Sequence, residues 1–201
     1  MQQHYFSARP SSPSKPGTVD LVLPDLRLTL DTDAGVFSPQ GVDAGTKLLL
    51  LDGPAPDAAA AGPFLDLGCG YGPIACALGR RAPDAEVWAV DVNERARELC
   101  VANADRAGLD GVRVAAPEDV PADLSFAGIW SNPPIRIGKP ALHALLLDWL
   151  PRLEPGAKAW LVVHKHLGAD SLAGWLGASI GPTTRVSSRA GYRILEVAPD
   201  R

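Results

Sequence analysis

The sequence is poor in cysteine and has no long apolar run. Its three cysteines, Cys69, Cys76 and Cys100, show no CxxC spacing. This odd, scattered set argues against a disulfide framework and against a zinc site. No stretch approaches the roughly 18 apolar residues of a membrane span, and the first residues lack the apolar core of a secretory signal. We therefore expect a protein with no membrane span and no bound metal, located in the reducing cytoplasm.

Basic residues are too few for a protein that coats nucleic acid through its overall positive charge. The 201 residues carry a net charge of −4. The charge is uneven, because residues 1–129 hold 10 basic and 18 acidic side chains whereas residues 130–201 hold 9 basic and 5 acidic ones. The imbalance fits two interpretations: chance combined with solvated helix faces, or a basic substrate face built from the C-terminal part of the chain.

Composition and turn signals predict one globular domain behind a short arm. Apolar residues make up 46% and charged residues 21% of the chain, as in ordinary globular domains. The Ser- and Pro-rich residues 1–18 form the expected arm. Alternating apolar residues at 18–23 and 27–31 predict a hairpin, and a helix is expected over 42–51, closed by Gly53.

After an Ala-, Pro- and Asp-rich linker at residues 54–62, short apolar runs alternate with helical patterns. This alternation predicts βαβ units and a mostly parallel sheet covered by helices on both faces. We therefore expect an α/β, Rossmann-like fold with a seven-stranded sheet whose last strand is antiparallel, preceded by an N-terminal hairpin and helix. The expected strands are 64–67, 86–90, 112–115, 127–131, 159–164, 183–187 and 192–197, and the expected helices are 73–81, 93–107, 141–150 and 170–176. Residues 19–201 are assigned to one domain, with a hairpin and helix lid at 19–62 and a core at 63–201.

A glycine-rich loop, DLGCGYG at 66–72, follows the first predicted strand of the core. Glycines there let the backbone turn sharply and let a ligand approach the main chain, and the helix that follows offers free N–H groups. Asp66 precedes the first glycine by two residues. Asp91 ends the next strand, where an acid accepts hydrogen bonds from ribose hydroxyls. A carboxylate beneath the loop suits a cationic ligand end better than a pyrophosphate.

This constellation resembles the class I S-adenosylmethionine (SAM) methyltransferases. The resemblance implies SAM as cofactor, with its amino-acid end at the glycine loop and its ribose at Asp91. Asp119 matches the position that often meets the adenine amine, and Glu118 is the competing choice. Alternatively, Asp119 is a helix cap or a solvated acid in a loop. The cofactor-binding residues that the resemblance implies are Phe37, Thr46, Asp66, Gly68, Cys69, Gly70, Gly72, Asp91, Val92, Asn93, Asp119 and Asn132.

The fourth strand of the core runs into SNPPI at 131–135, where ligands of open α/β sheets react. The segment resembles the N-P-P-aromatic motif of methyltransferases that act on planar amines. The Asn132 carboxamide oxygen and the Pro133 carbonyl can each accept one N–H bond, which fixes the amine and turns its lone pair toward the methyl group. A rigid proline turn after a buried strand is the structural alternative. The catalytic residues implied are Asn132, Pro133, Pro134 and Ile135.

Position 135 departs from that motif, and the cysteines limit the reaction. Ile135 stands where the motif usually carries an aromatic that stacks on the target base, and either Trp130 or Phe37 could compensate. Methylation at carbon 5 of a pyrimidine needs a cysteine nucleophile, and no cysteine follows the fourth strand. Cys76 and Cys100 are expected on apolar helix faces in the core.

Further segments make the resemblance more specific. With the loop and SNPP, they resemble the methyltransferase small (MTS) domain family, which includes bacterial guanine-N2 methyltransferases of 16S and 23S ribosomal RNA. The segments are HYFS at 4–7, GVFS at 35–38, DAGT at 43–46 and GYR at 191–193. The resemblance covers about residues 4–197 and implies that Phe37, Asp43, Gly45 and Thr46 lie near the cofactor, although Phe37 could simply be a core aromatic. We expect a single-domain member, without the second, degenerate methyltransferase-like domain that the ribosomal enzymes often carry.

The resemblance implies a SAM-dependent N-methyltransferase acting on an exocyclic base amine, most simply guanine N2 in ribosomal RNA. Ile135 and the acidic overall charge leave one alternative open, an acceptor amine in a protein glutamine or a small molecule. A SAM-binding protein without catalysis is another, because degenerate copies of this domain can be of that kind. A dinucleotide dehydrogenase is a further rival. The expected partner is ribosomal RNA or a ribosomal subunit, and the expected state is a monomer or weak dimer.

Several basic residues could follow an RNA backbone, although each could equally be an ordinary surface charge. His164 and His166 could touch phosphate, but two histidines without a third ligand make a poor metal site. The basic residues are Arg9, Lys15, Arg136, Lys139, Lys165, Arg189 and Arg193.

Overall fold

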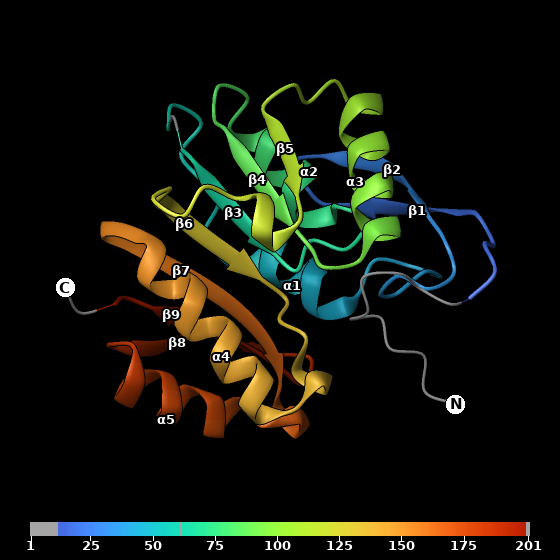
Figure 1. Cartoon of the computed structure of the whole chain (residues 1–201). Coiled ribbons are helices and arrows are strands. Elements are labelled where there is room, and N and C mark those ends of the chain that lie inside the picture. The colour runs from blue at the N-terminus through green and yellow to red at the C-terminus, as the bar shows by residue number, and fades with distance from the viewer. Residues whose placement is uncertain (1–11, 61, 200–201) are drawn as a thin grey trace.

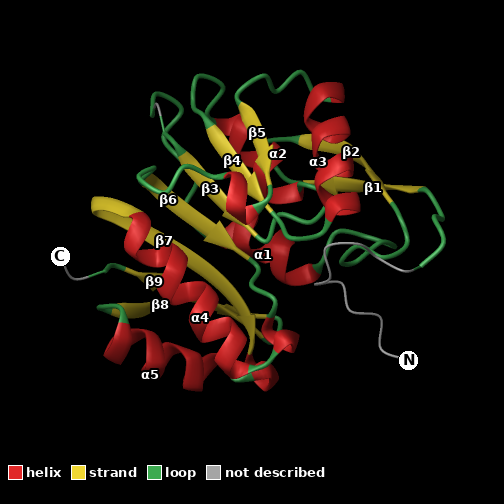
Figure 2. Cartoon of the chain, in the orientation of Figure 1, coloured by secondary structure: helices red, strands yellow, loops and turns green. Residues whose placement is uncertain are grey.

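The computed structural model describes residues 12–60 and 62–199. It has a twisted seven-stranded sheet with helices on both sides and a two-stranded hairpin beside it (Figures 1 and 2). The HYFS segment and Arg9 lie outside the described residues. The strands are β1 (Gly17–Val22), β2 (Arg27–Thr32), β3 (Phe64–Leu67), β4 (Val87–Val90), β5 (Val112–Ala115), β6 (Phe126–Ser131), β7 (Leu153–His164), β8 (Thr183–Arg189) and β9 (Tyr192–Val197). The helices are α1 (Ala44–Asp52), α2 (Pro73–Arg81), α3 (Glu94–Arg106), α4 (Lys139–Trp149) and α5 (Ala169–Ser179), with short 3₁₀ helices η1 (Pro117–Asp119), η2 (Ile135–Ile137), η3 (Leu150–Arg152) and η4 (Lys165–Leu167).

The sheet topology confirms the predicted fold. The strands lie in the order β5-β4-β3-β6-β7-β9-β8. All neighbouring pairs from β5 to β7 are parallel, and β9 lies antiparallel between β7 and β8. The strand order reverses between β3 and β6, because β4 and β5 extend from one side of β3 and β6 pairs with the other. Ligands of open α/β sheets bind at such a switch point, beyond the carboxyl ends of the strands.

Apolar side chains alternate between the two faces of the sheet and build two cores. In β3, Phe64 faces the core under α1, α2 and α3, whereas Leu65 and Leu67 face the core under α4 and α5. Cys76 and Cys100 are buried in the first core, as expected. Burial on both faces explains why these strands appear in the sequence as continuous apolar runs.

Element boundaries differ from the sequence prediction in a few places. β7 begins at Leu153, well before the expected residue 159, because Leu153 pairs with Phe126 ahead of an irregular step in the β6–β7 ladder. α4 begins at Lys139 because Pro140 fits the first turn of a helix, where no N–H is needed. The 3₁₀ helices were not predicted, since a single turn carries no hydrophobic period.

The hairpin is held against the helices and not over the strand ends. Asn103 of α3 donates to the Asp31 carbonyl at 2.9 Å and accepts from the Asp31 amide at 2.6 Å. Arg81 of α2 pairs with Asp25 at 2.8 Å. No residue of β1 or β2 lines the cavity described below. Of the expected lid, only the loop after β2 and the start of α1 reach the site.

In the described part of the chain, no helix is long and apolar enough to cross a membrane. Nor do residues 12–60 and 62–199 contain a group of three or more His, Cys, Asp or Glu side chains placed to bind a metal ion.

Candidate active site

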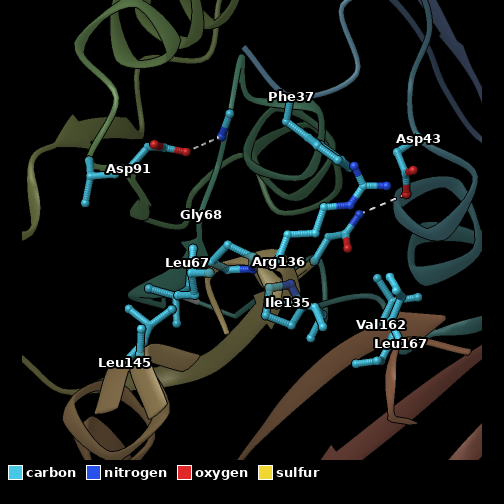
Figure 3. A pocket seen from close by; sticks show the side chains of 18 of the residues that line it. Phe37, Asp43, Leu67, Gly68, Asp91, Ile135, Arg136, Leu145, Val162 and Leu167 are labelled. Atoms are coloured by element: carbon cyan, nitrogen blue, oxygen red, sulfur yellow. Dashed lines mark hydrogen bonds between the residues drawn. The ribbon is translucent and has the colours of Figure 1, made fainter. Parts of the chain in front are cut away.

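A cavity of about 780 Å³ lies at the carboxyl ends of the central parallel strands. Gly68 follows β3, Asp91 follows β4, Asn132 follows β6 and His164 ends β7, and all four line it. We call Gly68, Gly70, Asp91 and Asn93 the cofactor end. We call Ile135, Arg136, Ile137, Leu145 and Leu167 the acceptor end. In Figure 3, Asp91 and Gly68 lie on the left, Asp43 lies on the right, and Arg136 and Ile135 lie between them.

The end of β4 fixes the backbone of the glycine loop. The amides of Gly68 and Cys69 donate to the Val90 carbonyl at 2.8 and 3.0 Å, and the Gly70 amide donates to the Asp91 carboxylate at 2.9 Å (Figure 3). Gly68 and Gly70 have φ angles of 77° and 57°, a region that favours glycine. A Cβ on Gly70 would meet no atom within 4 Å, so the loop leaves open space in front of it.

The third glycine of the loop serves packing between helices. Gly72 precedes α2 with a φ of 91°, and a Cβ there would come within 2.5 Å of the Cys100 sulfur. Glycine at this position lets α3 lie close to the start of α2. Gly72 does not line the cavity.

Two carboxylates lie near the loop in different settings, Asp91 half-buried and Asp66 fully buried. Asp91 lines the cavity and accepts from the Asn93 amide at 2.8 Å, and burial raises its pKa. Asp66 is buried beneath the loop, where it accepts from the Ala75 amide of α2 at 2.9 Å. Its Oδ1 has no hydrogen-bond partner among the described residues, and burial raises the pKa of Asp66 to about 8. Asp66 therefore supports the loop from below, while Asp91 faces the cavity.

The SNPPI segment forms a stiff turn at the end of β6. The Ser131 hydroxyl donates to the Leu67 carbonyl at 2.7 Å and ties β6 to the end of β3. Pro134 has φ −74° and ψ 67°, the values of an inverse γ-turn, and the Ile135 amide donates to the Pro133 carbonyl at 2.8 Å. The turn uses one lone pair of that carbonyl, so the second stays available to an acceptor molecule.

Two side chains from the start of α1 hold the Asn132 amide. Asn132 Nδ2 donates to the Asp43 carboxylate at 2.9 Å (dashed in Figure 3) and to the Thr46 hydroxyl at 3.0 Å. Because a carboxylate only accepts, the amide nitrogen must face Asp43 and the carbonyl oxygen must point away from it. Asp43 also caps α1 by accepting from the amides of Gly45 and Thr46.

Two motif segments far apart in the sequence pack against each other beside this network. A Cβ on Gly45 would come within 2.7 Å of the Tyr192 ring, so glycine is what allows their contact. Tyr192 lines the cavity and meets His164 edge-on, with ring centroids 4.8 Å apart. The DAGT and GYR segments are therefore parts of one wall.

Of the two aromatics that could compensate for Ile135, only Phe37 lies in the cavity wall. Phe37 is 44% exposed, so it is not a core residue. Trp130 is buried on the α1–α3 side of the sheet, where its ring packs against Phe64 and Trp160.

The structure brings most of the predicted site residues together. Those that line the cavity are Phe37, Gly68, Gly70, Asp91, Val92, Asn93, Asn132, Pro133, Pro134 and Ile135. Cys69 and Thr46 line a small adjoining hollow that Asn132 shares. Asp66, Gly72 and Asp119 line neither. Asp119 and Glu118 are exposed in η1, whose Pro117 reaches the cavity wall instead. The functional roles of these residues stay predictions.

Sequence reasoning missed most of the acceptor end. Ile137, Leu145 and Leu167 come from η2, α4 and η4. Apolar residues carry no chemical signal, and the sequence does not tell which face of α4 meets the strand ends. Position along the chain was the usable signal, because Ile137 comes two residues after SNPPI and Leu167 comes three residues after the end of β7.

Comparison with known proteins places the chain in a family. The model of the methyltransferase small domain matches residues 27–196. The uncharacterized protein YbxB of Bacillus subtilis (strain 168) is 35% identical over 199 residues, which cover 98% of each chain. The ribosomal RNA small subunit methyltransferase C of Pseudomonas aeruginosa (strain LESB58) is 33% identical over 178 residues, 87% of this chain and 52% of that protein. The chain thus spans about half the length of the methyltransferase C relatives it matches.

A solved structure shares the fold over nearly the whole chain. It is described as the Thermus thermophilus 16S rRNA N2 G1207 methyltransferase (RsmC) in complex with AdoMet and guanosine. The two chains are 24% identical, with a TM-score of 0.78, and the match covers 94% of this chain and 52% of that one.

The sheet order and the glycine loop at its switch point define the class I SAM-dependent methyltransferases. Within that class, the chain belongs to the methyltransferase small domain family. Family membership confirms the resemblance found in the sequence and identifies SAM as the cofactor.

Proposed function

We propose that this protein transfers a methyl group from SAM to an exocyclic amine of an RNA base, specifically guanine N2 in ribosomal RNA. The observation that carries the proposal is the Asn132 amide at the end of β6. Its nitrogen is fully engaged by Asp43 and Thr46, which leaves its carbonyl oxygen for an amine in the cavity. We also propose that the protein acts as a monomer or weak dimer.

The residues of the cofactor end fit SAM. The Asp91 carboxylate lines the cavity and would accept the ribose hydroxyls. The open space in front of Gly70 admits the amino-acid end, and Val92 and Pro117 offer apolar surface to the adenine. Asp66 is fully buried beneath the loop and lines neither hollow, so it would act on the amino-acid end only through the loop. When bound, SAM supplies a methyl group that its sulfonium already activates.

The chain's own catalytic task is therefore to position the amine. An aryl amine delocalises its lone pair into the ring, which makes it a weak nucleophile. Hydrogen bonds from its two N–H groups to Asn132 Oδ1 and the Pro133 carbonyl would hold the lone pair toward the methyl carbon. The nitrogen–carbon bond forms as the carbon–sulfur bond breaks, and the methylated amine then loses one proton to water. No strong base is needed.

Basic side chains beside the acceptor end support a nucleic-acid acceptor. Arg136, His164 and His166 line the cavity, and in Figure 3 the Arg136 side chain extends toward Phe37 and Asp43. Lys165 is exposed in η4, next to His166. These side chains would contact phosphates and fix the register of an RNA strand.

Other basic candidates have partners within the chain. Arg189 pairs with Asp52 at 3.1 Å, and Arg193 pairs with Asp170. Lys139 is exposed at the start of α4 and lies 3.3 Å from the Ser171 hydroxyl. The proposed RNA contact therefore rests on Arg136 and its neighbours around η4, and not on the final two strands.

The names of similar proteins support ribosomal RNA and guanine N2. The methyltransferase C relatives are named for the RNA of the small ribosomal subunit, and the neighbouring structure is named for N2 of a guanosine in 16S rRNA. Ribosomal RNA as acceptor would also agree with the cytoplasmic location expected from the sequence.

Ile135 favours a second candidate acceptor, a protein glutamine or a small-molecule amine. With Ile137, Leu145 and Leu167 it gives the acceptor end an apolar wall, without an aromatic at the place where a base would stack. The net charge of −4 also suits an acceptor that carries no phosphates. A SAM-binding protein without catalysis is the weaker alternative, because the engaged Asn132 amide would then have no use.

The proposal is tested by measuring the transfer of tritium from labelled SAM to total RNA from a strain that lacks this gene. Nucleoside analysis should give a single labelled peak of N2-methylguanosine. RNA from the parent strain is the control, since its sites are already methylated and should stay unlabelled. Label confined to protein or small molecules, with RNA blank, would reject the RNA acceptor and keep the methyltransferase.

A further inference from the structure

The Asn132 amide is held through both hydrogens of its nitrogen. Nδ2 lies 2.9 Å from Asp43 Oδ2 and 3.0 Å from Thr46 Oγ1. An amide nitrogen has two hydrogens, so both are used. A half-turn of the amide would place its carbonyl oxygen against the Asp43 carboxylate, where neither group can donate. The start of α1 therefore admits one orientation of Asn132 and excludes the other.

We infer that Asp43 and Thr46 are positioning residues for methyl transfer, which act by fixing the Asn132 amide with Oδ1 turned to the acceptor amine. The inference rests on the proposed function, because it takes Asn132 as the group that meets the amine. Asp43 adds a second effect. A charged acceptor on Nδ2 polarises the amide and makes its Oδ1 a stronger hydrogen-bond acceptor.

Further hydrogen bonds and close contacts hold these two side chains in place. Asp43 Oδ2 also accepts from the amides of Gly45 at 2.8 Å and Thr46 at 3.2 Å. Thr46 is only 3% exposed, and Gly45 lies directly against the Tyr192 ring. The amide of Asn132 is thus oriented before any acceptor arrives, which removes an ordering cost from the transfer step.

The first test observes the amide directly and needs no activity. The chain contains three asparagines, Asn93, Asn103 and Asn132, so labelling with ¹⁵N-asparagine gives three side-chain NH₂ pairs in an NMR spectrum. Loss of one pair in Asn132→Ala assigns it. We expect Thr46→Val to shift one proton of the Asn132 pair toward the position of an unbonded amide, because valine keeps the shape of threonine but cannot accept.

Matched variants separate the hydrogen bonds from the fold. Thr46→Ser keeps the hydroxyl and should leave the Asn132 pair in place. Asp43→Ser keeps a good helix cap but lacks the carboxylate, and should shift the other Asn132 proton. The pairs of Asn93 and Asn103 serve as internal references and should not move. If the Asn132 side-chain signals keep their wild-type chemical shifts in both Thr46→Val and Asp43→Ser, the inference is wrong.

The second test is kinetic. Loss of one hydrogen bond corresponds to about a five- to tenfold fall in kcat for Thr46→Val, with KM for the acceptor changed by less than about threefold. Thr46→Ser keeps the hydroxyl, so its kcat should stay close to the wild-type value. In an Asn132→Ala background, Thr46→Val should cause no further loss, because the group that it positions is gone. An equal loss in both backgrounds would show that Thr46 acts through the fold alone and would reject the inference.

A failure of this inference can be told apart from a failure of the proposed function. If wild-type protein labels no RNA but labels another fraction, the RNA acceptor is wrong, and the kinetic comparison is made on that fraction. If wild-type protein labels nothing, the proposed transfer is wrong, and the NMR comparison alone decides whether Asp43 and Thr46 orient Asn132.

Discussion

The two ends of the cavity are built in different ways. At the cofactor end, backbone amides bind a half-buried carboxylate: Gly70 and Asn93 both donate to Asp91. At the acceptor end, the walls are apolar side chains and the exposed Arg136, from elements that follow β6 and β7. The first end is shaped by the main chain at the strand ends. The second is shaped by side chains, so single substitutions there can change the acceptor without disturbing the cofactor.

The junction between the ends is Asn132, and its removal should give the largest effect. We expect Asn132→Ala to lower methyl transfer by about a hundred- to a thousandfold, because the amine loses the acceptor that orients it. The Kd for SAM should change by less than about threefold, since the bonds within the loop remain. Single-turnover transfer and calorimetric titration with SAM measure the two quantities. Full turnover by the variant would contradict the assigned chemistry.

The cofactor end is tested by Asp91→Asn, which should raise the Kd for SAM by about ten- to a hundredfold. Hydrogen bonds to a charged group contribute about 1.5–3 kcal/mol, and the variant removes the charge at nearly constant shape. Transfer at saturating SAM should fall much less, because the acceptor end is untouched. Asp105→Asn, an exposed position in α3 with the same change of charge, is the control. A loss confined to kcat would place Asp91 outside the ribose site.

The contrast between the ends also explains what sequence could predict. The glycine loop, Asp91 and SNPP stand directly after short apolar runs, and parallel strands bring such positions to one edge of the sheet. Most residues of the cofactor end followed from that rule. The rule failed for Asp66, which lies inside the strand itself and is buried under the loop.

Contacts between distant segments could not be predicted. Nothing in the spacing of Asp43, Thr46 and Asn132 shows that an amide and a helix cap share one hydrogen-bond network. The same holds for Gly45 against Tyr192, because close approach of a ring to a backbone depends on how α1 sits on the sheet. The family resemblance pointed to these segments, but only the structure joins them.

Asp66 should make stability depend on pH. Its pKa is raised by burial to about 8 in the folded protein, against an ordinary value of 3.8. Between those values the folded state binds a proton that the unfolded state has lost, so rising pH destabilises the fold, by at most about 1.4 kcal/mol per pH unit. Asp66→Asn should remove this contribution. Urea unfolding from pH 4 to 8 measures the difference from wild type.

The control for that comparison is Asp84→Asn, which changes an exposed carboxylate and should leave the slope as in wild type. If Asp66→Asn kept the wild-type slope, the Asp66 carboxylate would have to be ionised in the folded state. The loop would then rest on a buried charge.

The smallest effect is expected at Ile135, and it decides between acceptors. Ile135→Phe restores an aromatic at the acceptor end, and ring stacking contributes about 0.5–1.5 kcal/mol beyond area burial. If the acceptor is a base, its KM should fall by about two- to tenfold with kcat nearly unchanged. Leu147→Phe is the control, because Leu147 is 49% exposed on α4 and lies outside the cavity wall. A protein glutamine or an aliphatic amine has no ring face to gain from the change, so a larger ring would only narrow its pocket and raise KM. The sign of the change in KM therefore separates a base from a glutamine or an aliphatic amine.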